Sequence, residues 1–227
     1  YLNRFELLGD KMTLGHGVWL TDTDIDLLAG TGTHVCHCPS SNMRLRSGTM
    51  SLNRLAKRGI GVAIGIDEAG INDDRDMLQE MRLALNLHRK PGHQRTVPTP
   101  CQILRMATED SAMTTPFGAE IGVLEPGRVA DMTLIRWEQI AAPYLEPGVP
   151  VVRAILHRAK TSYVDTVIVG GKPVYRDGRF TRVDKEAVLE ELAASLSGPR
   201  TSVEERRRQI ARDVYGHVEA FYRGYLG

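Results

Sequence analysis

Two residues whose types could do hydrolytic chemistry stand where apolar runs give way to polar loops. His16 lies near the end of the short run 12–19, and Asp67 ends the apolar run 60–66. A histidine nitrogen and a carboxylate oxygen are common ligands of hydrolytic metal centres, and a nearby carboxylate can accept a proton from the activated water. Taken singly, an acid at a strand end can also cap a loop, and a lone histidine is more often structural. The two residues together predict metal-assisted hydrolysis if the fold brings them close.

The elements that must position them alternate between strand and helix. The run ending at Asp67 is typical of a buried strand in a parallel sheet, which is small and β-branched throughout. Strands are expected at 12–19, 34–38 and 60–67, helices at 21–29 and 50–57, and a polar loop at 39–42. This order indicates βα units of an α/β fold. In a β/α barrel the C-terminal strand ends face the active site, so His16 and Asp67 should converge.

The remaining chain predicts more helices and a small β module. Helices are expected at 74–89, at 100–107 with a capping box of Thr99 and Gln102, at 184–196, and at 202–225 with a capping box of Ser202 and Glu205. The last helix has a strong apolar stripe that should pack on the barrel or on a subunit partner. Strands are expected at 130–135, 166–169 and 172–175, the last two joined as a hairpin through Gly170 and Gly171. The expected domains are therefore 1–117 (barrel part), 118–182 (small β domain) and 183–227 (terminal helices).

Composition limits the kind of protein. The 227 residues are 42% hydrophobic and 25% charged with a formal net charge of +1, which are ordinary globular values. No basic stripe with interleaved aromatic residues indicates nucleic acid as a partner. No apolar run of about 18 residues indicates a membrane span, and residues 1–5 do not begin a signal peptide. An odd, low count of three cysteines favours a reducing compartment, so a cytoplasmic location is expected.

The stretch Cys36-His37-Cys38 could suggest a soft-metal cluster. On a strand, however, His37 would point to the face opposite the two cysteines, which makes a poor zinc chelate. The other histidines of the later chain are expected to be structural or exposed; they are His88, His93, His157 and His217.

Several motifs in one order resemble the amidohydrolase superfamily, in particular the branch of s-triazine chlorohydrolases and of cytosine, guanine and adenosine-type deaminases. The segments 15–20 (GHGVWL), 37–45 (HCPSSNMRL) and 65–67 (GID) resemble the family's motifs at the ends of barrel strands six, seven and eight. Residues 77–82 resemble its helix eight, and 122–131 (GVLEPGRVAD) match its entry into the small β domain. The similarity extends over about residues 10 to 180. It implies the C-terminal part of a TIM-type barrel, about strands six to eight, with part of a small β-sandwich.

The resemblance also implies roles for individual residues. Asp67 would be a ligand of a divalent metal, zinc or alternatively iron, and the base that accepts a proton from the metal-bound water. His16 would lie beside that water and the reacting carbon, where it polarises or shuttles a proton. Asn42 and Ser41 would line the rim of the substrate pocket, and His37 would lie at the same rim without binding the metal.

The chain also departs from the family pattern. The His-x-His pair of the first strand is absent, and so is the fifth-strand histidine followed three residues later by glutamate. Glu68 follows the aspartate where the family has glycine, which would favour a cationic or amino-bearing ring. The sequence therefore resembles the C-terminal half of such an enzyme and holds about two of the metal ligands.

Two interpretations remain open. In the first, the protein is a metal-dependent amidohydrolase that deaminates a small aminated heterocycle, with dechlorination by the same groups as the alternative. In the second, the chain is a truncated or non-catalytic subunit that lacks the N-terminal ligands. Family analogy adds a homo-oligomer as the expected assembly.

Overall fold

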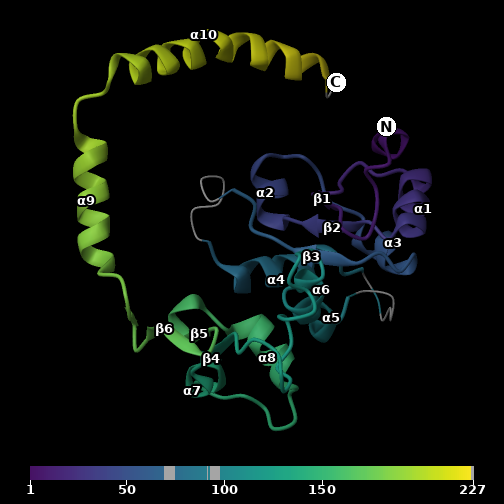
Figure 1. Cartoon of the computed structure of the whole chain (residues 1–227), viewed down its shortest axis with the longest axis vertical. Coiled ribbons are helices and arrows are strands. Elements are labelled where there is room, and N and C mark those ends of the chain that lie inside the picture. Colours follow the sequence, from purple (N-terminus) through teal and green to yellow (C-terminus); the bar gives the residue numbers. More distant parts are fainter. Residues whose placement is uncertain (69–74, 91, 93–97, 226–227) are drawn as a thin grey trace. The chain divides into compact units, whose positions relative to one another are not determined.

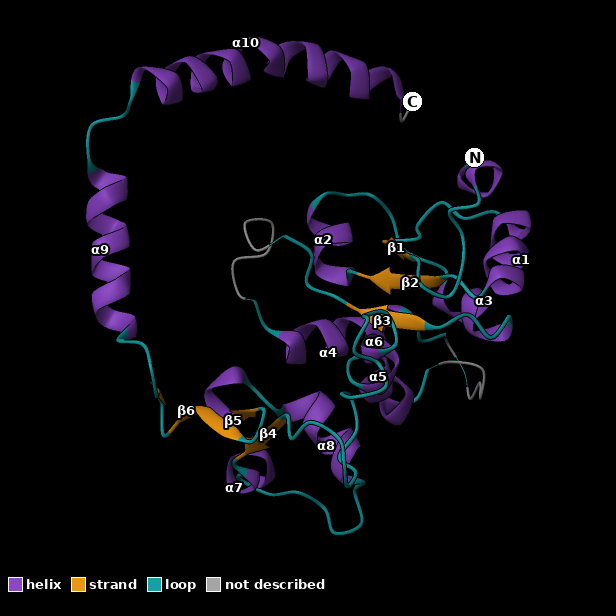
Figure 2. Ribbon diagram, in the orientation of Figure 1, coloured by secondary structure: helices purple, strands orange, loops and turns teal. Residues whose placement is uncertain are grey.

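Three short parallel strands form the sheet of the N-terminal region (Figures 1 and 2). They are β1 (Thr13–Gly15), β2 (His34–His37) and β3 (Val62–Ile64), and β2 lies between the other two. Gly15 is in register with Cys36, and Cys36 with Ala63, so the three strands end near one line. The predicted βα order and the parallel pairing are thus confirmed.

The computed structural model describes residues 1–68, 75–90, 92 and 98–225. These form two compact units, residues 1–181 and 182–227. The expected loop 68–73 and the start of the helix expected at Asp74 fall largely outside the described residues, as does His93. The expected boundary between residues 117 and 118 stays a prediction.

Helices on the first unit pack around the sheet. They are α1 (Asp22–Thr31), α2 (Pro39–Arg44), α3 (Leu52–Lys57), α4 (Met77–Leu87), α5 (Pro100–Met106), α6 (Glu109–Ala112), α7 (Trp137–Ala141) and α8 (Val151–Arg158), with short 3₁₀ turns at Leu2–Phe5 and Thr161–Tyr163. One apolar core joins α1, α3, α4, α5 and α8 to the strands through Ile25, Val35, Leu55, Met81, Ile103 and Leu156, which are nearly inaccessible to solvent. Ile140 of α7 packs with Ala154 of α8 in a second, smaller cluster. Burying each such side chain stabilises the folded state by about 1.5–3 kcal/mol. This packing holds the strand ends in place.

The prediction of a polar loop at 39–42 is wrong, because α2 begins at Pro39. Proline suits the first helical position, since its fixed φ is helical and its missing N–H is not needed there. The Ser40 N–H donates to Oε2 of Glu80, a fully buried residue of α4, at 3.1 Å. The partner that satisfies this turn lies 40 positions along the chain, so the local sequence could not show it.

Local capping signals were otherwise reliable. Thr21 with Asp24 and Thr99 with Gln102 form complete capping boxes at α1 and α5, the second of which was predicted. The box predicted for the last helix is wrong by one residue, because Thr201 and Glu204 form it instead. Two overlapping Ser/Thr-x-x-Glu patterns occur there. The earlier one places Thr201 directly before Ser202, the first residue of α10, so Thr201 is in the position to cap the helix.

A four-stranded antiparallel sheet follows in the same unit. It contains β4 (Met132–Ile135), β5 (Val164–Val169), β6 (Lys172–Arg176) and β7 (Arg179–Phe180), in that order. The hairpin through Gly170 and Gly171 is confirmed, and both glycines have positive φ (56° and 74°). The helices α7 and α8, which lie between β4 and β5, were not predicted. Leu156 of α8 enters the core, and Arg82 of α4 donates to the carbonyls of Leu156 and Ala159.

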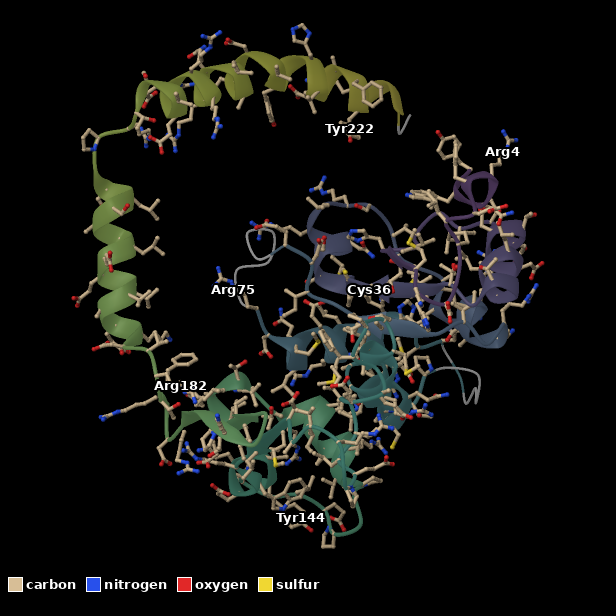
Figure 3. All side chains as sticks on the ribbon, in the orientation of Figure 1. Arg4, Cys36, Arg75, Tyr144, Arg182 and Tyr222 are labelled. Atoms are coloured by element: carbon tan, nitrogen blue, oxygen red, sulfur yellow. The ribbon has the colours of Figure 1, made fainter. Side chains whose placement is uncertain are left out.

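The second unit consists of α9 (Lys185–Ser197) and α10 (Ser202–Tyr225). Figure 3 shows their side chains, with Tyr222 labelled on α10. The residues of both helices whose burial is described are all exposed, including the apolar residues Val188, Leu192, Ile210 and Val214. Their packing on a barrel or a subunit partner stays a prediction. Among the described helices, none has the length and apolar character needed to cross a membrane.

Gly17, directly after His16, offers a test of how tightly β1 is packed at its end. Gly17 and Gly59 both have left-handed backbones (φ +60° and +69°), but a Cβ on Gly17 would lie 2.8 Å from Val35 Cγ1, whereas one on Gly59 would meet nothing within 4 Å. Gly59→Ala should therefore cost about 1 kcal/mol of unfolding free energy for the backbone alone. Gly17→Ala should cost at least about 1 kcal/mol more because of overpacking. Urea denaturation of both variants measures the difference, and equal losses would contradict it.

Candidate active site

The structure brings His16 and Asp67 together at the C-terminal ends of β1 and β3. His16 Nε2 lies 3.5 Å from Asp67 Oδ2, and the two side chains are 41% and 26% exposed. β2 separates their strands, so the contact spans the end of the sheet. A basic nitrogen and a carboxylate oxygen thus converge at a solvent-accessible strand edge, as the sequence predicted. Glu68, the next residue, is exposed.

Both residues adopt an unusual backbone conformation. His16 has φ 65° and Asp67 has φ 73°, in the left-handed region that residues other than glycine rarely occupy. Such a conformation costs roughly 1–3 kcal/mol and tends to occur at functional sites. The backbone of His16 stays attached to the sheet, because its N–H donates to the Cys36 carbonyl at 2.8 Å. Both residues whose side chains meet thus carry this backbone strain, which the chain also has at Glu6, Arg46, Arg75 and Asp177.

The first turn of α2 supplies the side chains that hold this pair. Ser41 Oγ donates to Asp67 Oδ2 at 2.6 Å, and Asn42 Oδ1 lies 2.8 Å from His16 Nδ1. Ser41 is fully buried and Asn42 is 2% exposed. Both were expected at the rim of a substrate pocket, whereas the structure buries them and directs their polar atoms at His16 and Asp67. This placement follows from the helix that replaces the expected loop. Direct contact of Ser41 and Asn42 with a substrate stays a prediction.

The His37 side chain of β2 is fully buried, and its place at the rim of a pocket stays a prediction. Its Nε2 is 3.0 Å from Nε2 of His88, the residue that ends α4. Burial lowers the pKa of His37 to about 3, with the nearby His88 and His16 contributing, and burial lowers the pKa of His88 to about 4. The sequence predicts His88 to be structural or exposed. It is buried, and no local pattern indicates its pairing with His37.

The two cysteines of the Cys-His-Cys stretch face β3. A Cβ on Gly65 would lie 2.7 Å from Cys36 Sγ and 3.3 Å from Cys38 Sγ, so glycine leaves the room that these thiols fill. Figure 3 labels Cys36 at the sheet. A hydrogen bond from Cys38 lowers the pKa of Cys36, while the same bond and burial raise the pKa of Cys38. The expected separation of the cysteines from His37 is thus seen.

The side chains at the strand ends match part of a divalent-metal site. His16 Nε2 and Asp67 Oδ2 converge as two donors of the kind zinc accepts. Within the described ranges, however, no group of three or more His, Cys, Asp or Glu side chains is placed to hold an ion. A stable zinc site needs three or four protein ligands. The described residues therefore fit part of a metal site and do not complete one.

Parallel strands that alternate with helices define an α/β protein, and His16 and Asp67 meet beyond the C-terminal ends of those strands. The sequence profile of the amidohydrolase family matches residues 1–174. The chain belongs to the amidohydrolase family.

Known proteins similar to the chain agree with this assignment. A 5-methylthioadenosine/S-adenosylhomocysteine deaminase of Pyrococcus furiosus is 35% identical over 189 residues, which cover 83% of this chain and 44% of that protein. The solved structure of an adenosine deaminase from Xanthomonas campestris with bound zinc superposes with a TM-score of 0.78 at 30% identity, covering 85% of this chain and 43% of that one.

A third similar protein is named for a different reaction. The solved structure of a variant of atrazine chlorohydrolase from Arthrobacter aurescens, complexed with zinc and atraton, has a TM-score of 0.76 at 25% identity and covers 85% of this chain and 42% of that one. The chain therefore spans less than half the length of the proteins it matches. The chain shares its fold and family with these proteins.

Proposed function

We propose that the chain provides one part of the active site of a metal-dependent deaminase. The reaction is hydrolytic removal of an amino group from an aminated heterocycle. The observation that carries the proposal is the 3.5 Å approach of His16 Nε2 to Asp67 Oδ2 at the strand ends. Enzymes of this class need a base for water and a group beside the reacting carbon, and these two residues supply them.

The substrate class is an adenine nucleoside or a derivative altered at its 5′ position. Support comes from the named activities of two similar proteins, the methylthioadenosine/adenosylhomocysteine deaminase and the adenosine deaminase. The exposed Glu68 adds a carboxylate next to Asp67, where it could accept hydrogen bonds from an exocyclic amine or from ribose hydroxyls. Glu68 is therefore proposed as a substrate-binding residue.

Asp67 and His16 divide the proton transfers of such a reaction. Water adds to the ring carbon that carries the amine, and Asp67 accepts a proton from that water. The same proton passes to the amine nitrogen, the carbon–nitrogen bond breaks and ammonia leaves. His16 accepts a hydrogen bond from the attacking water and orients it toward the ring carbon. Ser41 keeps the Asp67 carboxylate in position through the 2.6 Å hydrogen bond.

A divalent metal, with zinc preferred and iron as the alternative, is proposed as the cofactor, since two of the similar structures contain zinc. When bound, it would supply a water of lowered pKa. Asp67 is the ligand proposed from this chain. The remaining ligands would come from outside the described residues.

The place of the three strands in the fold is also a proposal. A parallel sheet in the order β1-β2-β3, followed by an antiparallel sheet, supports assigning β1 to β3 as about strands six to eight of a TIM-type barrel. The superposition on the adenosine deaminase, covering 85% of this chain, supports the same assignment. A homo-oligomer and a cytoplasmic location stay predictions.

Dechlorination is the second candidate, because the atrazine chlorohydrolase shares the fold at a TM-score of 0.76. The experiment that separates the candidates is an assay of the protein, expressed from its own gene, with adenosine, methylthioadenosine and atrazine. Ammonia release from a nucleoside, with metal bound in a defined ratio, is the expected result. Chloride release from atrazine alone would favour the second candidate. If metal-loaded protein releases neither ammonia nor chloride, both candidates are wrong and the interpretation as a non-catalytic subunit is supported.

A further inference from the structure

Asn42 contacts the ring nitrogen of His16 that faces away from Asp67. Its Oδ1 lies 2.8 Å from His16 Nδ1, while His16 Nε2 lies 3.5 Å from Asp67 Oδ2. Asn42 is only 2% exposed, so its amide must find its partners within the protein, and His16 Nδ1 is one of them. A buried polar contact of this kind is costly to leave unmade.

We propose that Asn42 is a positioning residue that fixes His16 as the tautomer with its proton on Nδ1. An amide oxygen has lone pairs and no hydrogen, so the contact with Nδ1 requires that this nitrogen donate. The neutral imidazole then carries its lone pair on Nε2. Asn42 thereby decides which kind of group His16 presents to the reaction, without touching a substrate itself.

The arrangement on the other side of the ring agrees with this tautomer. Asp67 Oδ2 already accepts a hydrogen bond from the Ser41 hydroxyl at 2.6 Å. It lies 3.5 Å from His16 Nε2, which is long for a direct hydrogen bond. A separation of 3.5 Å does not require a proton on the line between the two atoms, so it is compatible with an unprotonated Nε2. His16 and Asp67 therefore present two acceptors toward one point at the edge of the sheet.

The left-handed backbone of His16 explains why an external partner is needed. With φ 65°, the residue occupies a sparsely populated conformation, and its ring is 41% exposed. The bond from Asn42, anchored in α2, both orients the ring and offsets part of the backbone strain.

The amide orientation of Asn42 makes the proposal falsifiable. Its Nδ2 is buried and has no hydrogen-bond partner among the described residues. Rotating the amide by a half turn would aim Nδ2 at His16 and would demand the opposite tautomer, with the proton on Nε2. The two arrangements differ in the position of one proton, which can be observed directly.

The test is ¹⁵N-detected NMR of the histidine rings in the full chain near pH 8, with EDTA present so that no metal competes for Nε2. His16→Gln assigns the signal. The expected result is a protonated Nδ1 and an unprotonated Nε2. Asn42→Leu should move His16 toward the Nε2–H form, and Asn42→Asp, which still offers an acceptor, should keep the Nδ1–H form.

Asn53→Leu is the matched control, because its Nδ2 donates to the His88 carbonyl at 3.1 Å and does not touch the site. It should leave the His16 signal unchanged. An Nε2–H tautomer in the parent chain would overturn the proposal whatever the variants do, so a variant that fails to fold does not remove the test.

The role of this tautomer in catalysis rests on the proposed deaminase function. The NMR measurement of the tautomer does not depend on that function. A chain with the expected tautomer and no deamination would overturn the proposed function alone. A deaminating protein with the Nε2–H tautomer would overturn only the role of Asn42.

Discussion

Asp67→Asn should reduce the rate of deamination by at least about 10³-fold, because the variant loses both the proton acceptor and the proposed metal-ligand charge. The fold should survive. Asparagine tolerates the left-handed conformation at φ 73°, and its side-chain oxygen can still accept the Ser41 hydrogen bond. The expected signature is therefore a large loss of kcat with little change in the free energy of unfolding.

Ammonia release and urea denaturation, measured on the same preparation, check this prediction. Asp26→Asn is the matched control, because Asp26 is an exposed carboxylate paired with Arg58 at 2.7 Å and lies away from the site. A surface pair of this kind contributes about 0–1 kcal/mol, so activity and stability should both stay near the parent values. An Asp67→Asn variant that keeps activity within about tenfold would refute the role assigned to Asp67.

The second large effect is a loss of stability in mild acid. The pKa values of the buried His37 and His88 lie at about 3 and about 4, below the ordinary 6.5. Below pH 6.5 both histidines are therefore protonated in the unfolded chain but stay neutral in the folded chain. The free energy of unfolding decreases as the pH falls, until the pH reaches the pKa values of the folded state. Each histidine contributes about 1.4 kcal/mol per pH unit in this window. The free energy of unfolding should be about 3 kcal/mol lower at pH 5.5 than at pH 7.5.

Urea denaturation at a series of pH values measures this slope. His88→Gln should roughly halve it, because one of the two titrating groups is gone while an amide can still meet His37 Nε2. His217→Gln removes an exposed histidine of α10 and should leave the slope unchanged. A stability that is flat between pH 7.5 and 5.5 would show that the buried pair does not behave as the geometry requires.

The sequence alone determined the elements that carry strong local signals. The strand 34–37 and the cap of α5 at Thr99 need only neighbouring residues to form, and so does the hairpin at Gly170 and Gly171. The order of strands and helices indicated a parallel sheet, and its carboxyl-terminal edge followed from that. For this reason His16 and Asp67 could be paired before any distance was known.

Only the tertiary structure decided what surrounds that pair. The helix at Pro39 depends on Glu80, which lies 40 positions away from Ser40. The contacts of Ser41 and Asn42 with the site each span 26 positions, and the pairing of His37 with His88 spans 51. No local pattern encodes such contacts, because they exist only after the strands and helices have packed around a common core.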